Sequence, residues 1–89
     1  MTTDDEALPY VLVRVRVTTD GDPGILTRLL GYFQHLNVTP RKVLAEFGGP
    51  ERMYLQIDVC GLPVERVELI TAKMGQVPSV LSAYWHRLV

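Results

Sequence analysis

Apolar and polar side chains alternate along residues 10–17, at the start of the patterned part of the chain. The apolar face carries Val11, Val13, Val15 and Val17. The opposite face includes Arg14 and Arg16. A period of two, with β-branched residues on the apolar side, is typical of a strand that packs on one face only. This pattern predicts a β-strand over residues 10–17.

After a turn rich in aspartate and glycine, the apolar spacing changes from that of a strand to that of a helix. The apolar positions are Ile25, Leu26, Leu29, Leu30, Phe33 and Leu36. Such a stripe predicts an amphipathic helix over residues 23–36. Asp22 suits the N-cap, and Pro23 suits the first helical position, where its missing N–H costs nothing. Asn37 suits the left-handed conformation that ends many helices.

Residues 42–47 and 51–60 predict two further strands, because Gly48, Gly49 and Pro50 break the chain between them as in a hairpin. The second of these strands has one apolar face, formed by Met53, Leu55, Ile57 and Val59. Its last residue, Cys60, is expected to be a buried thiol.

A second helix is predicted over residues 64–75, followed by a last strand over residues 80–89. The apolar stripe of the helix consists of Val64, Val67, Leu69, Ile70 and Met74. Pro78 prevents the helix from continuing. The inward face of the last strand stays open at this point. Leu81, Ala83 and Trp85 compete for it with Val80, Tyr84 and Leu88.

The order strand, helix, strand, strand, helix, strand predicts a ferredoxin-like βαββαβ sandwich of the α+β class. In it a four-stranded antiparallel sheet carries two helices on one face. Right-handed crossovers place the first and third strands in the centre, with residues 42–47 at an edge. The face away from the helices would then carry Arg14, Arg16, Arg52, Tyr54 and Gln56. Such a mixed face is either an ordinary solvated surface or a docking surface, and the first is favoured. We expect one domain over residues 10–89, preceded by a flexible acidic tail over residues 1–9.

Composition narrows the function classes. The net charge is −1 and the basic residues are scattered, which argues against a nucleic-acid partner. No apolar run approaches the roughly 20 residues that cross a bilayer. One cysteine and two histidines form neither a disulfide nor a metal cluster. With an acidic start, the reverse of a signal peptide, this predicts a cytoplasmic protein without membrane attachment.

The turn from Asp20 to Gly24 is the best candidate site for a small anionic ligand. A helix N-terminus presents unpaired backbone N–H groups and the positive end of the helix dipole. Gly24, Ile25 and Leu26 are placed to offer such donors to a carboxylate or phosphate. The same residue types also build turns that only reverse the chain and cap a helix, and from the residues alone that use is the more common one.

Estimates of the binding free energy indicate that this turn would form only half of a ligand site. A contact with the helix dipole contributes about 0.3–2 kcal/mol. Burial of one valine-sized side chain adds about 1.5–3 kcal/mol. The sum barely reaches the roughly 4 kcal/mol of a millimolar complex, before any cost of association. We therefore expect a second wall from another subunit. Because unpaired edge strands invite pairing, residues 42–47 predict a homodimer in which two sheets join or abut.

The strand, the turn residues Asp22-Pro23-Gly24-Ile25-Leu26 and the later Asn37-Val38 resemble the ACT domain over residues 10–89. ACT domains are βαββαβ modules that bind amino acids and regulate metabolic enzymes. Within that family, residues 24–29 are most similar to the small regulatory subunit of acetolactate synthase. Leu29, Phe33, Ile70, Lys73-Met74 and residues 77–80 fit the same pattern.

The resemblance implies a non-catalytic subunit that binds and activates an acetolactate synthase large subunit in branched-chain amino-acid biosynthesis. The thiamine diphosphate of that complex would belong to the large subunit, so no cofactor is expected on this chain. The expected effector is valine or a related small amino acid. The residues that would line its half-site are Gly21, Asp22, Gly24, Ile25 and Leu26. Gly21 stands where valine-sensing subunits commonly carry asparagine, which weakens the expectation of feedback sensing.

Two alternatives come from other function classes. The first is a free-standing ACT sensor that acts on another enzyme. The second is an enzyme of the small acylphosphatase type, which ranks last because the loop after the first strand is acidic and lacks arginine. No nucleophile and base stand in a catalytic pattern. His35 is expected to be a solvent-facing structural residue near the end of the first helix, and His86 has no acidic or cysteine partner nearby in the sequence. We therefore predict neither catalysis nor a metal site.

Overall fold

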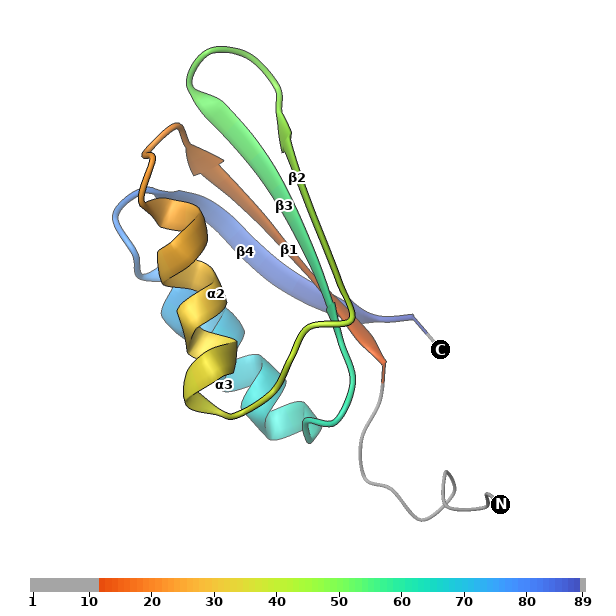
Figure 1. The fold of residues 1–89 in the computed structure, drawn as a ribbon. Coiled ribbons are helices and arrows are strands. Elements are labelled where there is room, and N and C mark those ends of the chain that lie inside the picture. The colour runs from red at the N-terminus through yellow and green to blue at the C-terminus, as the bar shows by residue number, and fades with distance from the viewer. Residues whose placement is uncertain (1–11, 89) are drawn as a thin grey trace.

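The computed structural model describes residues 12–88. The predicted tail over residues 1–9 lies outside the described residues, as do Tyr10, Val11 and Val89. The elements follow the predicted order: β1 (Val13–Asp20), α2 (Ile25–His35), β2 (Lys42–Phe47), β3 (Arg52–Val59), α3 (Val64–Gly75) and β4 (Val80–Arg87). Both helices lie on one face of the sheet (Figure 1). The predicted ferredoxin-like βαββαβ fold is confirmed.

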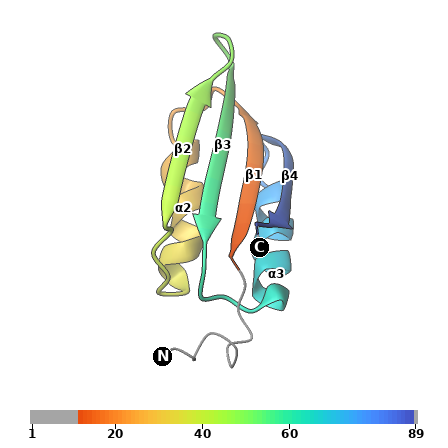
Figure 2. The same cartoon turned by 90° about the vertical axis from the view of Figure 1, so that its right-hand side faces the viewer.

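The sheet is antiparallel throughout, in the order β2-β3-β1-β4. Figure 2 looks onto its open face, with α2 behind the β2 side and α3 behind the β4 side. The prediction that β1 and β3 are central is therefore confirmed, as is the edge position of β2.

The core lies between the sheet and the two helices. It contains the predicted valine face of β1 and the apolar face of β3. The largest fully buried side chains include Phe33, Leu29, Ile57 and Met74. The prediction for Leu69 is wrong, because this side chain is 49% exposed. Thr71, a polar residue of the same helix, is buried instead. Its hydroxyl donates to the Val67 carbonyl at 2.8 Å, so the hydroxyl is not left without a partner.

A β-bulge explains the unclear period of the last strand. Trp85 pairs with Val15 and therefore faces the helices. Val80 pairs with Thr19 and also faces them, because the register shifts between Thr18 and Thr19. The extra residue, Leu81, is 54% exposed. One inserted residue reverses the alternation, so neither set of candidates could occupy the inward face along the whole strand.

Several boundaries differ from the prediction. β1 continues to Asp20, because Thr18 and Thr19 still pair with β3. α2 begins at Ile25 rather than at Pro23, and its N-cap is Gly24 rather than Asp22. Asn37 takes the predicted left-handed conformation, with φ of 59°.

The third strand is shorter than predicted at both ends, because β3 spans Arg52–Val59. Cys60 follows it and is half-buried rather than buried. The last strand, β4, ends at Arg87.

Edge strand β2 is exposed along its whole length. Val43 and Phe47 pair with the buried Ile57 and Met53, so their side chains are on the helix side of the sheet. They are nevertheless 42% and 73% exposed. We call the residues Val43, Ala45 and Phe47 the β2 strip. Apolar surface of this kind is typical of a contact with another molecule.

Among residues 12–88, the helices are too short and too polar to cross a membrane. The same residues contain no group of three or more histidine, cysteine or acidic side chains placed to hold a metal ion.

Candidate functional site

The turn between β1 and α2 is held in place by the carboxylate of Asp22. Its Oδ1 accepts the Gly24 N–H at 3.1 Å, and its Oδ2 accepts the Ser79 hydroxyl at 3.1 Å. The Asp20 N–H donates to the Ser79 carbonyl at 2.9 Å. The turn is therefore tied to the segment that leads into β4.

Two of the three predicted backbone donors are already engaged. The Gly24 N–H binds the Asp22 carboxylate, and the Ile25 N–H donates to the Asp22 carbonyl at 3.2 Å. Among the described residues, the N–H groups of Leu26 and Thr27 have no backbone or side-chain acceptor. The helix N-terminus thus keeps a donor pair for a ligand, one residue further along than the sequence indicated.

The charge of Asp22 changes which ligand suits this turn. A carboxylate of the protein beside the helix N-terminus repels a simple anion and attracts an ammonium group. The free N–H groups of Leu26 and Thr27 attract a carboxylate. A ligand that carries both groups on one carbon atom, such as an α-amino acid, matches the turn better than a phosphate does.

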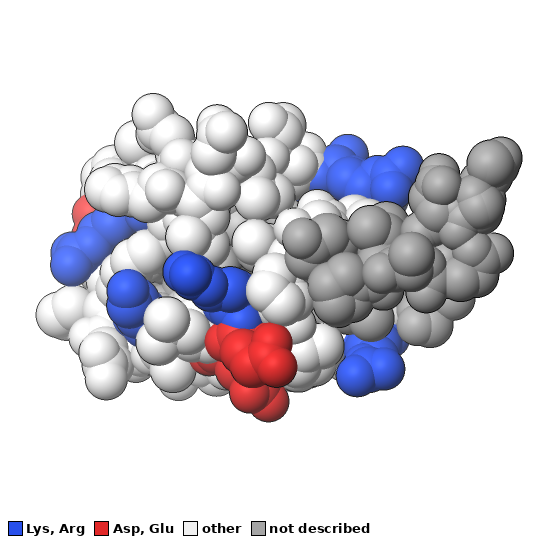
Figure 3. All heavy atoms as spheres, turned by 90° about the horizontal axis from the view of Figure 1, so that it is seen from below, with Lys and Arg blue, Asp and Glu red and all other residues white. Residues whose placement is uncertain are grey.

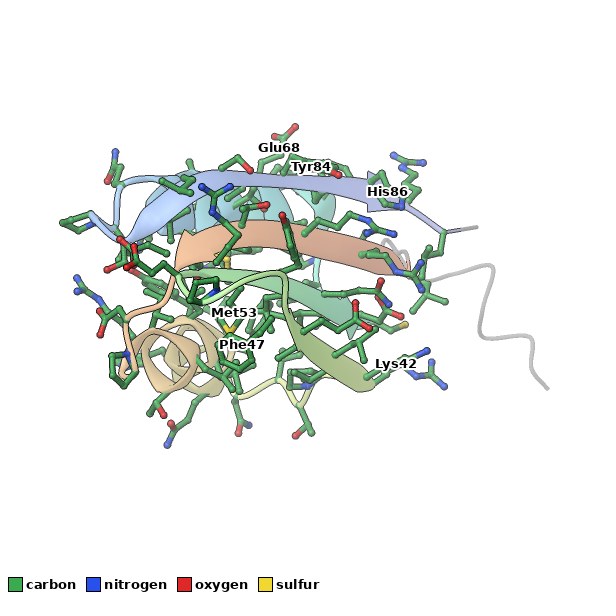
Figure 4. The ribbon with its side chains drawn as sticks, turned by 90° about the horizontal axis from the view of Figure 1, so that it is seen from above. Lys42, Phe47, Met53, Glu68, Tyr84 and His86 are labelled. Carbon is green, nitrogen blue, oxygen red and sulfur yellow. The ribbon has the colours of Figure 1, made fainter. Side chains whose placement is uncertain are left out.

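A small cleft of about 140 Å³ opens between this turn and the β2–β3 hairpin. Its lining consists of Asp20, Gly21, Asp22, Pro23, Ile25, Leu26, Ala45, Phe47 and Met53. Figure 4 shows Phe47 and Met53 beside α2. Four of the five predicted effector residues line the cleft, and Gly24 does not.

Sequence reasoning missed the hairpin wall of the cleft, which Ala45, Phe47 and Met53 form. The available signal was the alternation in residues 42–47, which places Ala45 and Phe47 on the same side as the apolar face of β3.

The structure gives a packing reason for Gly21. A Cβ on Gly21 would lie 3.3 Å from the Glu51 Cα and 3.5 Å from the Pro50 carbonyl oxygen. A side chain at this position would therefore press against the hairpin backbone, which would have to shift by a few tenths of an ångström. A Cβ on Gly24 would meet only the Asp22 Oδ1, at 3.9 Å, so the fold tolerates a side chain there.

The sequence profile of the ACT-like domain family matches residues 6–89. The chain belongs to the ACT-like domain family. The resemblance to ACT domains is thereby confirmed at the level of the family. No curated protein matches the sequence.

Solved structures show how widely this ACT-like fold recurs. The ACT domain of GTP pyrophosphokinase from Chlorobium tepidum is 10% identical, with a TM-score of 0.74 over 92% of each chain. The C-terminal domain of MgtC from Mycobacterium tuberculosis is 18% identical, with a TM-score of 0.69 over 85% of each chain.

A homoserine dehydrogenase from Thiobacillus denitrificans is 13% identical, with a TM-score of 0.70 over 88% of this ACT-like domain and 17% of that chain. At these identities the likeness establishes the fold alone. These neighbours are not acetolactate synthase small subunits, so they do not support the narrower resemblance.

Other polar side chains of this ACT-like domain include an ion pair on the central strands and two exposed histidines. Arg14 binds Asp58 through two hydrogen bonds, Nε to Oδ1 at 2.8 Å and Nη2 to Oδ2 at 3.0 Å. These bonds lower the pKa of Asp58 below its ordinary value, against the opposing effect of burial. His35 is exposed, and so is His86, whose ring stacks on Tyr84 with centroids 6.5 Å apart.

Proposed function

We propose that this ACT-like domain is a regulatory module that binds a small apolar amino acid at the β1–α2 turn. One observation carries the proposal: Asp22 and Leu26 line the same cleft, and the Leu26 N–H has no acceptor among the described residues. The ammonium group of the ligand would contact Asp22, and its carboxylate would accept from the backbone. Its side chain would contact Phe47 and Met53.

A second copy of the chain would complete this site. The cleft of about 140 Å³ is smaller than the roughly 300–1,000 Å³ of typical small-molecule sites. Its hairpin wall consists partly of the β2 strip, which is exposed in the single chain. Pairing of β2 with β2 of a second copy would cover the strip and add a wall to the cleft, which supports the predicted homodimer.

The decisive experiment is calorimetric titration with valine, leucine and isoleucine, alongside two analogues of valine. Isovalerate lacks the ammonium group, and isobutylamine lacks the carboxylate. We expect valine or one of its neighbours to bind at micromolar to millimolar concentration. Each analogue should bind at least about tenfold more weakly, because each loses one charged contact. Equal binding of isovalerate and valine, or no binding of any amino acid, would overturn the proposal.

Two variants locate the site. Asp22→Asn removes the charge that attracts the ammonium group and keeps the size of the side chain. Ser79→Ala is the matched control, because it removes the hydroxyl that binds Asp22 and keeps the charge. We expect binding to fall about tenfold or more in the first variant and to change less than about threefold in the second. Similar losses in both variants would indicate that the turn geometry matters rather than the charge.

The target of regulation is a separate proposal. The sequence resemblance to acetolactate synthase small subunits favours docking to, and activation of, a large subunit of that enzyme. The alternative is a free-standing sensor that acts on another enzyme. Co-purification with a large subunit from the same genome, and a gain in its activity, would support the first. No stable complex, together with binding of an amino acid, would favour the second.

A further inference from the structure

We propose that the groove between α2 and α3 is a second ligand site, which takes a small amphipathic anion: an apolar chain that ends in a carboxylate. The groove lies on the helix face and shares no lining residue with the cleft at the β1–α2 turn. Thr27 has a part in both, because its N–H is a donor of the proposed amino-acid site and the residue also lines the groove, but the other observations that carry the groove proposal are separate from that site.

The groove has the size of a small-molecule site. Its volume is about 470 Å³, inside the roughly 300–1,000 Å³ that such sites occupy. The lining residues are Thr27, Arg28, Gly31, Tyr32, His35 and Leu36 of α2 and the segment after it, with Arg66, Leu69, Ile70 and Lys73 of α3. Residues 27–36 extend about 13 Å along the helix axis, so the groove suits an extended chain rather than a compact ligand.

Gly31 and Leu69 make the middle of the groove open and apolar. A Cβ built on Gly31 meets no atom within 4 Å, so the absence of a side chain leaves free space between the helices. Leu69 is 49% exposed, although its place in the apolar stripe of α3 predicted burial. An apolar ligand would cover Leu69 and occupy the space above Gly31.

The charges around the groove have one sign. Arg28, Arg66 and Lys73 line it, and no acidic residue does. Among residues 12–88, none of these three cations forms an ion pair. The helices run antiparallel (Figure 1), so Arg28 and Lys73 are at one end of the groove and Arg66 is at the other.

The figures show where the charges gather. Figure 4 shows Glu68 of α3 on the β4 side of the molecule, away from α2. Figure 3 shows the molecule from below, with basic side chains on both the left and the right of this face and an acidic cluster between them near its lower edge.

This charge pattern selects the occupant. A second copy placed helix face to helix face would bring like charges together, which is unfavourable. A neutral apolar molecule would leave the cations unused. An apolar chain with a carboxylate matches both the middle of the groove and its cationic ends.

The probe is sodium decanoate, and its binding to the full chain is followed through the amide chemical shifts. Decan-1-ol and decyltrimethylammonium are the neutral and cationic controls. We expect decanoate to shift the amides of Gly31, Tyr32 and Leu69 and to bind at least about threefold more tightly than decan-1-ol. We expect no saturable binding of decyltrimethylammonium. Equal binding of the anion and the cation would overturn the proposal.

A pair of glycine variants tests the location. Gly31→Leu fills the groove, and we expect the variant to fold, because its Cβ has free space and the change raises helix propensity. Gly75→Leu is the matched control, because Gly75 also has free space around its Cβ but lies outside the groove. We expect Gly31→Leu to weaken decanoate binding at least about tenfold and Gly75→Leu to change it less than about twofold. Equal affinities in the two variants would overturn the proposal.

Charge variants test the anion contact. We expect Arg28→Gln and Lys73→Gln each to weaken decanoate binding about two- to fivefold and to leave decan-1-ol binding unchanged. Asp22→Asn should leave decanoate binding unchanged. If decanoate binding depended on Asp22 and not on Arg28 or Lys73, the anion would occupy the β1–α2 turn, and the groove proposal would be wrong.

Discussion

The two edges of the sheet carry apolar residues of similar kind and differ in what covers them. On β4, Val80 is only 8% exposed, and Trp85 is half-buried beneath α3. On β2, Val43 and Phe47 face the same side of the sheet and are 42% and 73% exposed. The sequence patterns of the two strands alone do not show this difference, because both contain apolar residues on the helix side.

The connections to the two strands account for part of the difference. A short segment, residues 76–79, joins α3 to β4, and it is held by hydrogen bonds from the Val77 N–H to Met74 and from the Val80 N–H to Val77. The connection from α2 to β2 is longer. It joins the sheet where the Arg41 N–H donates to the Asp58 carbonyl at 2.7 Å. The tight connection holds β4 against its helix, whereas α2 leaves the residues of β2 exposed.

The uncovered edge is also the edge that lines the candidate cleft. Ala45 and Phe47 belong both to the β2 strip and to the cleft wall. A partner that covers β2 would therefore change the cleft, and a ligand in the cleft would change the surface offered to the partner. We therefore expect association and ligand binding to be linked in this ACT-like domain. If the dimer binds the ligand more tightly than the monomer does, the ligand must in turn favour the dimer.

The largest expected effect is on association through β2. Val43→Asp places a charge on the β2 strip and should raise the dissociation constant of the proposed homodimer at least about a hundredfold. Leu81→Asp is the matched control on the β4 edge, where the replaced side chain is 54% exposed. Sedimentation equilibrium over a range of concentrations measures both variants. A dimer that persists in Val43→Asp and dissociates in Leu81→Asp would place the interface on β4.

The next effect concerns the stability of the single chain. Trp85→Ala removes side-chain contacts under α3 and should lower the free energy of unfolding by about 2 kcal/mol. Phe47→Ala should change it by less than about 0.5 kcal/mol at concentrations where the chain is monomeric, because most of that side chain is exposed. Urea unfolding measures both. Equal losses in the two variants would show that β2 is covered in solution even in the monomer.

A smaller effect is expected where the β2–β3 hairpin touches the turn. Gly21→Ala places a Cβ 3.3 Å from the Glu51 Cα and should cost about 1–2 kcal/mol of unfolding free energy. Gly24→Ala has room and should change stability by less than about 0.5 kcal/mol. Thermal unfolding of the pair separates the two glycines. A tolerated Gly21→Ala would mean that the hairpin loop moves away from the turn at little cost.

The smallest effect is the pH dependence of the Arg14–Asp58 pair, which joins the central strands and concerns neither edge. Arg14 lowers the folded-state pKa of Asp58 below its ordinary value of 3.8. The unfolded chain therefore binds more protons near that pH, so the contribution of the pair is present above pH 3.8 and is lost as the pH falls through the lower folded-state pKa.

The free energy of unfolding, measured at a series of acid pH values with and without Asp58→Asn, gives this contribution. The difference in unfolding free energy that Asp58→Asn causes should depend on pH in the same way in the Trp85→Ala and Phe47→Ala backgrounds. A difference between these backgrounds would show that the ion pair is coupled to one edge of the sheet.

Local periodicity was sufficient to predict the helices and strands of residues 12–88 and their order, and the handedness of the crossovers then placed β2 at an edge. It failed where a residue's place depends on a distant segment. Leu69 has the spacing of a core residue, but it lies beside the gap at Gly31 and stays exposed. The inward face of β4 depended on the bulge at Leu81, which pairing with β1 imposes.

The candidate site was likewise predicted only where it depends on neighbouring residues in the sequence. The sequence by itself determined that a helix N-terminus with nearby aspartates follows β1, because turn and helix chemistry are local. The tertiary structure decided which N–H groups stay free, since Asp22 engages Gly24 and Ser79, a residue far along the chain. It also decided that Ala45, Phe47 and Met53 form the opposite wall, and that Gly21 accommodates the hairpin. These contacts join segments distant in sequence, so only the packing of the whole domain brings them to one place.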